Sequence, residues 1–310
     1  MAVAELRGTV MASQLNVIIG HPRHQTQLPE VRALLQRLES LWSRFIPTSD
    51  VSRINTGAGQ AVEVAPETIL LIETMRQAWG DTQGRYDPTT LPVLMSHGYA
   101  VSKCDPARRT VLPGGPYRLG AMGEIGVDRV GSTVTLPVGV AIDPGGIGKG
   151  LAADLAVASL LSGGACGALV SIGGDLRVDG EPPESTGWRI NIEHAEPTDR
   201  PLCQVTVDRG GVATSSTRTR RWNHNGRVRH HVIDPFSGTE ADTDLAAVTV
   251  FSTSGWQAEA FATAAILGSS ANVLDYLDSH DLTGLAITTE GTVLLTHDLD
   301  GLVPTAAGVR

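Results

Sequence analysis

Cysteine is scarce in this chain, with three residues among 310, at Cys104, Cys166 and Cys203. Their number is odd, they lie far apart, and no two of them form a C-x-x-C pair. A disulfide framework needs an even set of cysteines, and a cysteine zinc site needs closely spaced pairs. The sequence therefore suggests neither, and it predicts inert thiols.

Positive charge is also in short supply. Lys and Arg together number 24 against 33 Asp and Glu, which gives a formal net charge of −9. General nucleic-acid binders and membrane-surface binders need a positive field, so the composition argues against both classes. An anionic ligand would need locally placed Lys or Arg residues, or a metal ion.

Long apolar runs are absent, so no segment is a candidate for crossing a membrane. Residues 1–7 lack the basic start and apolar stretch of a secretory signal, and no lipoprotein-like cysteine follows them. We therefore expect a cytoplasmic protein with no membrane anchor. Nothing in the sequence indicates the oligomeric state.

Aromatic residues make up only 4% of the chain, whereas hydrophobic residues as a whole reach 41%. A large core built mainly from Ala, Val, Leu and Ile is expected, and the 35 glycines indicate many tight turns. No repeat, charge block or low-complexity linker divides the chain. We expect a single domain of two lobes over residues 1–310, with a loose tail after about residue 300.

Hydrophobic spacing predicts helices and strands that alternate along the chain, which makes the expected fold class mixed α+β. Residues 102–136 show no strong period and are expected to form a peripheral, turn-rich segment. The predicted helices cover residues 28–45, 51–55, 66–79, 148–162, 255–267 and 271–279. The predicted strands cover residues 10–19, 138–142, 168–172, 188–194, 203–207, 246–252, 284–288 and 292–296.

The stretch DPGGIGKG, at residues 143–150, connects an apolar strand-like segment to a helical pattern. Backbone N–H groups at a glycine turn and at a helix N-terminus favour an anion, and Lys149 can add a point charge there. The spacing is not that of a Walker motif. The plainer alternative for Lys149 is a surface lysine near a turn.

The stretch HHVIDPFSG, at residues 230–238, places His231 three residues before Asp234 and just ahead of a Pro/Gly turn. Histidine is the side chain best suited to proton transfer near neutral pH. Asp234 could orient this histidine or simply hold the turn. His230 is interpreted as a bystander.

Together with other short motifs, these two stretches form an ordered series that runs along nearly the whole chain, from residue 11 to about residue 267. They are found at residues 11–13, 42–47, 86–89, 143–150, 172–176, 213–215, 231–238 and 258–264, with Ser49, Ser52 and Asn55 after the second of them. Each motif is weak alone, but the ordered set resembles the ApbE family. Members of that family are flavin transferases, which take FMN from FAD and attach it to a threonine of an acceptor protein.

The resemblance implies an ApbE-like fold of β-sheets packed with helices, with FAD bound in a cleft between two lobes. It places His231 at the position of the family's catalytic base. It implies a magnesium ion held by the Gly146 carbonyl and by the side chains of Glu259 and Thr263. It also implies that FAD is contacted by Met11, Phe45, Arg85, Tyr86, Asp87, Asp143, Lys149 and Ile233.

Glu259 and Thr263 lie four residues apart on a predicted helix, so both side chains could reach one cation. Mg²⁺ accepts carboxylate, hydroxyl and carbonyl oxygens, and Mn²⁺ takes similar ligands. The alternative is a solvated glutamate beside a packed threonine. Family members usually have Asp at the position of Glu259. Pro144, Gly148 and Ser216 also differ from the commonest family residues.

Other polar residues in these motifs allow two interpretations each. Asp87 and Asp143 precede prolines, so turn capping is an alternative to ligand binding. Asp175 is expected to act as structural support. The pair Thr214 and Ser215 could line a diphosphate channel or hydrogen-bond a loop.

The predicted function is Mg²⁺-dependent transfer of FMN from FAD to a Thr or Ser hydroxyl of an acceptor flavoprotein, with release of AMP. Two alternatives use the same site. One is an FAD-binding protein with little transferase activity, and the other is an FAD pyrophosphatase that gives FMN and AMP. The sequence does not identify the acceptor.

Overall fold

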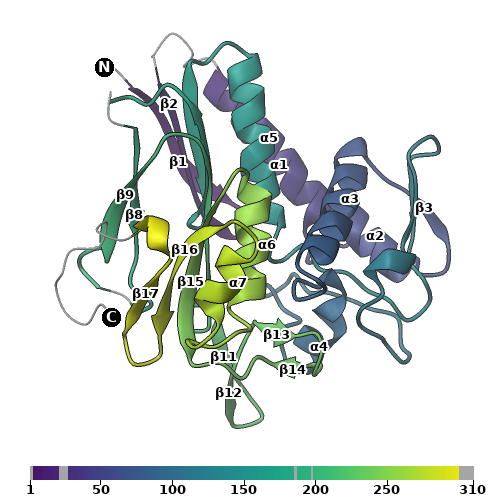
Figure 1. Ribbon diagram of the computed structural model, residues 1–310. Helices are drawn as coiled ribbons and strands as arrows, with labels where there is room; N and C mark the ends of the chain where they lie inside the picture. The colour runs from purple at the N-terminus through teal and green to yellow at the C-terminus, as the bar shows by residue number, and fades with distance from the viewer. Residues whose placement is uncertain (1–2, 21–26, 185–186, 197, 300–310) are drawn as a thin grey trace.

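An eight-stranded antiparallel sheet forms the centre of the computed structural model, which describes residues 3–20, 27–184, 187–196 and 198–299 (Figure 1). The loose tail expected after about residue 300 lies outside the described residues. In spatial order, the strands are β1 (Val3–Val10), β2 (Ser13–Gly20), β6 (Gly167–Ile172), β7 (Asp175–Gly180), β10 (Gly210–Ser216), β15 (Leu245–Ser252), β16 (Thr283–Thr288) and β17 (Val293–Leu295).

Both faces of this sheet are covered. Helices pack on one face, and a β-hairpin packs on the other (Figure 1). Alternate residues of β6 therefore enter different cores, with Val170 facing the helices and Leu169 facing the hairpin. The helices are α1 (Gln27–Trp42), α5 (Gly148–Ser162), α6 (Gly255–Ala265) and α7 (Val273–Asp278), and the hairpin is β8 (Trp188–Ile192) with β9 (Cys203–Val207).

A second group of elements lies beyond these helices, on the side away from the sheet (Figure 1). It consists of α2 (Asp50–Thr56), α3 (Pro66–Asp81), α4 (Leu91–Ser96), the short helices η2 (Pro88–Thr90) and η3 (Met122–Glu124), and a small sheet of β3 (Ala61–Glu63), β5 (Thr133–Thr135) and β4 (Gly126–Asp128). Two short pairs, β11 (Arg221–His224) with β12 (Arg227–His230) and β13 (Ile233–Asp234) with β14 (Thr239–Glu240), follow β10, and η4 (His297–Leu299) closes the described chain.

Helices and strands are present in the mixed α+β arrangement that the sequence predicts. One predicted strand is wrong in part and another is wrong in whole. The strand at 10–19 is interrupted at Met11 and Ala12, whose φ angles of 51° and 56° form the tight turn between β1 and β2. Residues 138–142 are not a strand. Their last residue, Ile142, pairs instead with the side chain of Asn55, which donates to the Ile142 carbonyl and accepts from its N–H, both at 2.8 Å.

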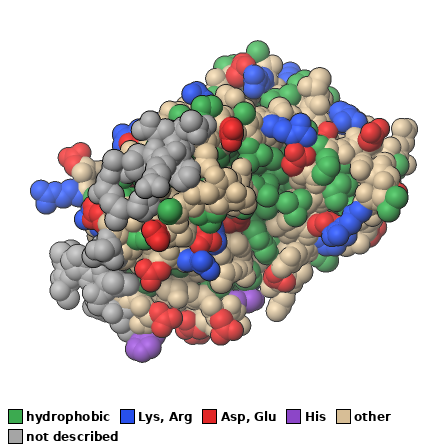
Figure 2. Space-filling model, turned by 90° about the horizontal axis from the view of Figure 1, so that it is seen from above, with side chains coloured by type: hydrophobic (Ala, Val, Ile, Leu, Met, Phe, Trp, Pro, Cys, Tyr) green, Lys and Arg blue, Asp and Glu red, His purple; other side chains and the backbone are tan. Residues whose placement is uncertain are grey.

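None of the described helices is both long and apolar enough to cross a membrane. On the face drawn in Figure 2, acidic and basic side chains are interspersed, without a broad basic area. This agrees with the charge balance of the sequence.

Helices α5 and α6 are in direct backbone contact at Gly150 and Gly255. A Cβ atom on Gly255 would lie 2.7 Å from the Gly150 carbonyl oxygen, and one on Gly150 would overlap the Gly255 carbonyl. The contact sets the distance between Lys149 on α5 and Glu259 on α6. Close packing of the two glycines therefore positions the side chains that meet in the site described below.

We expect Gly150→Ala to lower the free energy of unfolding by about 1–3 kcal/mol, because the added methyl group forces two helix backbones apart. Chemical denaturation measures this loss. Gly80→Ala is the matched control, since Gly80 is an exposed helical glycine with nothing within 4 Å of its added Cβ. The control is expected to gain about 0.5–1 kcal/mol from helix propensity. Equal stabilities for the two variants would contradict the close contact.

Candidate active site

Two adjoining cavities, of about 210 and 320 Å³, are lined by residues of the sheet-bearing part and of the second group of elements, and Leu94 of α4 lines the first of them. They share wall residues that include Phe45, Asp143, Lys149 and Glu259. Eleven of the twelve site residues expected from the sequence line the first cavity, and Met11 lines the second. Residues separated by up to 252 positions along the chain are thus brought to one place.

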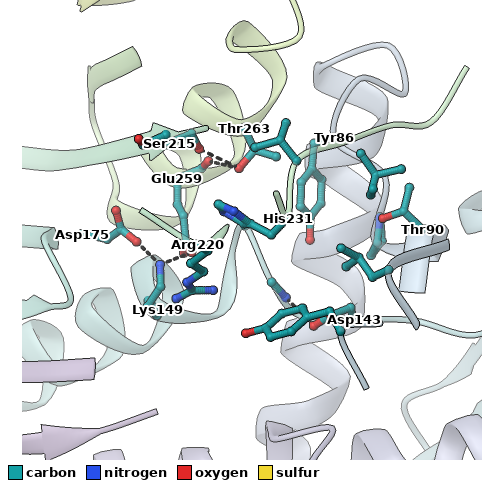
Figure 3. Close-up of a pocket in the computed structure, with 18 of the residues that line it drawn as sticks. Tyr86, Thr90, Asp143, Lys149, Asp175, Ser215, Arg220, His231, Glu259 and Thr263 are labelled. Carbon is teal, nitrogen blue, oxygen red and sulfur yellow. Dashed lines mark hydrogen bonds and ion pairs between the residues drawn. The ribbon is translucent and has the colours of Figure 1, made fainter. Parts of the chain in front are cut away.

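A lysine held between two carboxylates forms one wall of the first cavity (Figure 3). The Lys149 ammonium forms an ion pair with Glu259 Oε1 at 2.6 Å and another with Asp175 Oδ2. Glu259 Oε2 also accepts a hydrogen bond from the Gly150 N–H at 2.7 Å. One ammonium therefore faces two buried carboxylates, which leaves the cluster with net negative charge. Asp175, expected to be structural support, is a full member of this cluster.

The ionisation of the cluster follows from these contacts. Burial alone lowers the pKa of Lys149, but the charges of Asp175 and Glu259 outweigh it, so the pKa lies above its ordinary value. Burial raises the pKa of Glu259, and the Lys149 ammonium opposes that rise. Lys149 is therefore a charged group whose charge is already compensated.

The residues implied for a magnesium ion lie together beside this cluster. The Thr263 hydroxyl donates to the Glu259 carbonyl at 3.0 Å and lies 3.2 Å from the Ser215 hydroxyl. A Cβ atom on Gly146, whose φ is +82°, would lie 2.9 Å from Thr263 Oγ1, so that glycine's backbone comes close to the threonine. The ligand atoms implied here are all oxygens, and the ammonium of Lys149 beside Glu259 shows that this carboxylate attracts a cation. This chemistry fits a hard divalent cation.

Among the residues that the structure describes, no three His, Cys, Asp or Glu side chains are grouped so as to hold a metal. A site with few charged protein ligands suits Mg²⁺, because Mg²⁺ keeps several water or phosphate oxygens as ligands.

Arg44, which the sequence motifs include without a role, organises the opposite wall. Its buried guanidinium forms an ion pair with Asp143 at 2.9 Å and donates to the Thr110 hydroxyl at 2.6 Å. It also lies 4.1 Å from the centre of the Phe45 ring and 4.9 Å from that of Tyr99. Arg44 therefore fixes two predicted FAD contacts, Phe45 and Asp143. The position of Arg44 next to Phe45 in a motif was the one sequence feature that could have pointed to this role.

The two aspartates that precede proline both cap turns. Asp87 accepts hydrogen bonds from the Thr89 N–H and hydroxyl and from the Gly120 N–H, at 2.7–2.8 Å. Asp143 accepts from the Gly145 N–H at 2.9 Å, in addition to its ion pair with Arg44. Asp87 therefore caps its own turn, binds the backbone at Gly120 and lines the first cavity. Asp143 is shared between the turn and the cavity wall.

Arg85 and Tyr86 point in different directions from the loop before η2. The Arg85 guanidinium lies 4.6 Å from the centre of the Tyr276 ring, on the side of α7. Tyr86 is 1% exposed, and its hydroxyl has no hydrogen-bond partner among the described residues. Figure 3 shows that hydroxyl pointing into the space between His231 and Asp143. A buried, unpartnered hydroxyl aimed at a cavity is suited to meet a polar ligand.

His231 lies between β12 and β13, where it lines the first cavity. Its buried Nδ1 has no hydrogen-bond partner within the described parts of the chain. Burial lowers the pKa of His231 well below its ordinary value, and the positive charge of Arg220 adds to this effect. Asp234 accepts from the Phe236 N–H at 2.9 Å, so it holds the turn. His231 is therefore a neutral imidazole, able to accept a proton.

Polar residues on β10 support the same wall. Thr214 donates its N–H to Asp175 at 3.2 Å, and its hydroxyl pairs with that of Thr249 at 2.8 Å. Ser216, found where the family usually has glycine, donates to the Ala246 carbonyl at 2.9 Å and is buried. This serine at the end of β10 is accommodated by a hydrogen bond to the neighbouring strand β15.

Comparison with known proteins finds a matching family model and similar proteins that share one name. A family model described as the ApbE family matches residues 8–286. The chain is similar to the FAD:protein FMN transferase of Vibrio cholerae serotype O1, with 25% identity over 269 residues that span 83% of this chain and 79% of that protein. It is also similar to the FAD:protein FMN transferase of Treponema pallidum, with 26% identity over 267 residues, 76% of this chain and 70% of that protein.

Solved structures share the fold. The flavinyl transferase ApbE of Pseudomonas stutzeri aligns with a TM-score of 0.80 at 26% identity, covering 97% of both chains. The ApbE protein of Thermotoga maritima aligns with a TM-score of 0.84 at 23% identity, covering 98% of this chain and 100% of that one.

Proposed function

The chain belongs to the ApbE family, and we propose that it transfers FMN from FAD to a Thr or Ser hydroxyl of an acceptor protein, with AMP as the leaving group. The names of the similar proteins support the general reaction. The observation that carries the proposal is that His231, whose buried Nδ1 has no partner among the described residues, lines the same cavity as Lys149, Glu259 and Thr263.

The reaction breaks the phosphoanhydride bond of FAD and forms a phosphoester bond to the acceptor. The acceptor hydroxyl oxygen forms a bond to the phosphorus on the flavin side of FAD. The bond between that phosphorus and the bridging oxygen breaks, and AMP leaves with the bridging oxygen. His231 takes the proton of the hydroxyl, which is the work of a general base. The unpartnered Tyr86 hydroxyl is available to hydrogen-bond the donor.

A divalent cation, Mg²⁺ or Mn²⁺, would be held by the Gly146 carbonyl, Glu259 and Thr263. When bound, it would supply positive charge against the charge that develops on the diphosphate. The chain's own contribution is to hold these oxygens together through the contact of α5 with α6.

A single assay tests the proposal against its alternatives. The protein is incubated with FAD, Mg²⁺ and a candidate acceptor flavoprotein domain, followed by in-gel flavin fluorescence and chromatography for FMN and AMP. We expect a fluorescent acceptor band and AMP. Free FMN with AMP and no band would indicate a pyrophosphatase. Intact, bound FAD would indicate a binding protein, and failure to bind FAD would contradict the whole proposal.

The pH dependence of transfer is expected to reflect the lowered pKa of His231. A base with a depressed pKa stays neutral as the pH falls through the ordinary histidine range, and it loses activity only below that range. Burial lowers this pKa most, and the positive charges of Arg220, His230, Lys149 and Lys103 lower it further. Initial rates measured from neutral to acid pH should show the acid limb below the ordinary histidine value. A limb at or above that value would remove His231 from the role of base.

A further inference from the structure

Arg220 lies in the wall that the two cavities share, and no sequence motif assigned it a role. It follows β10 in a turn just before β11 and lines both cavities. Figure 3 shows its side chain beside Lys149 and His231, and its charge affects the pKa of both. The Arg220 guanidinium therefore faces the place where the cavities join.

Four other cations of these walls have partners. Lys149 is held by Asp175 and Glu259, Arg44 by Asp143, and Arg108 in the second cavity by Asp105 at 3.0 Å. Arg85 lies against the Tyr276 ring.

Within the described ranges, Arg220 has no hydrogen bond or ion pair with another residue. Lys103 has no ion pair there either, but it is exposed and lines the second cavity only. Arg220 is thus the uncompensated cation at the junction.

This charge distribution determines where an anion can bind. The Lys149 cluster has net negative charge and would repel a diphosphate on its own. Adding Arg220 brings the formal charge of the cluster to zero, and the planar guanidinium can donate two parallel hydrogen bonds to phosphate oxygens.

We propose that Arg220 binds the diphosphate of FAD, at the junction of the cavities. The inference rests on the proposed function for the identity of the ligand. Arg220 then contacts the group that departs as AMP, and Lys149 serves mainly to hold the two carboxylates in place. The chain offers the neighbouring Arg221 as a control, because Arg221 is exposed and lines neither cavity.

The test compares binding of FAD with binding of riboflavin, which lacks phosphate, in Arg220→Gln and Arg221→Gln. Loss of one charged hydrogen-bonding group should weaken FAD binding about 10- to 100-fold in Arg220→Gln. Riboflavin binding should stay unchanged, and Arg221→Gln should match the unaltered protein with both ligands. FAD affinity should also fall less steeply with added salt in Arg220→Gln.

Arg220→Lys should recover part of the affinity, because it keeps the charge but loses the planar fork. Unchanged FAD affinity in Arg220→Gln, or an equal loss for riboflavin, would overturn the inference. Binding of inorganic pyrophosphate, measured by calorimetry, separates this inference from the proposed function. If the unaltered protein binds pyrophosphate but not FAD, the proposed function fails, and the effect of Arg220→Gln on pyrophosphate still decides the role of Arg220. If it binds neither, both fail.

Discussion

Replacing His231 with alanine is expected to lower the rate of FMN transfer about 10²- to 10⁴-fold, the usual contribution of a general base, with FAD affinity nearly unchanged. The expectation follows from the lowered pKa of His231, which leaves the ring neutral, and from its place in the first cavity. Labelling of an acceptor measures the rate, and flavin fluorescence measures binding in the same preparation.

His230→Ala is the matched control for this prediction. The backbone N–H of His230 donates to Glu240 at 2.6 Å, and its ring accepts from the Val232 N–H at 3.3 Å. These contacts support the turn, so the control should retain most of the transfer activity. Near-normal labelling by His231→Ala, or equal losses in the two variants, would count against His231 as the base.

Replacing Glu259 with alanine is expected to lower Mg²⁺-dependent transfer about 10²- to 10³-fold, as is typical when a group that stabilises developing charge is removed. Glu259 links α6 to α5 through Lys149 and the Gly150 N–H. Its loss therefore removes a proposed metal ligand and releases one side of the lysine. Asp175 still pairs with Lys149, so the ammonium is not left alone and the protein should fold.

Glu259→Asp separates charge from length at this position. It restores the side chain that the family usually has, and we expect it to preserve or raise transfer, with the same requirement for Mg²⁺. The activity of both variants is measured over a range of Mg²⁺ concentrations. Complete loss of transfer in Glu259→Asp would mean that the site of this protein requires the longer side chain of glutamate. Full activity of Glu259→Ala would exclude Glu259 as a metal ligand.

The residues singled out from the sequence line two adjoining cavities, but their contacts with one another could not be predicted. Motif residues such as Asp143 and His231 flank turns whose glycines and prolines are visible in the sequence, and the structure places them around adjoining cavities. The ion pair between Lys149 and Glu259 joins residues 110 positions apart, and no local pattern encodes it. Asp234 shows the same limit, because its spacing from His231 could not decide whether it orients that histidine or holds the turn.

The errors in the fold have similar causes. The segment at 138–142 has the apolar character of a strand, but the amide of Asn55 takes the place of a neighbouring strand at Ile142. Strand β7 and the pair β11 and β12 were not predicted, since their sequences DLRVDG, RWNH and RVRH contain many charged or polar residues. Arg220 was missed because it is one of five arginines between residues 218 and 229, and nothing in their spacing singles it out.

The most direct test of the account is mass spectrometry of an acceptor flavoprotein after incubation with the protein, FAD and Mg²⁺, alongside the same reaction with His231→Ala. The account predicts an acceptor whose mass increases by that of FMN less water at a Thr or Ser, with AMP released in equal amount, and no such increase with His231→Ala. An unmodified acceptor beside intact FAD bound to the unaltered protein, or modification that persists in His231→Ala, would contradict it.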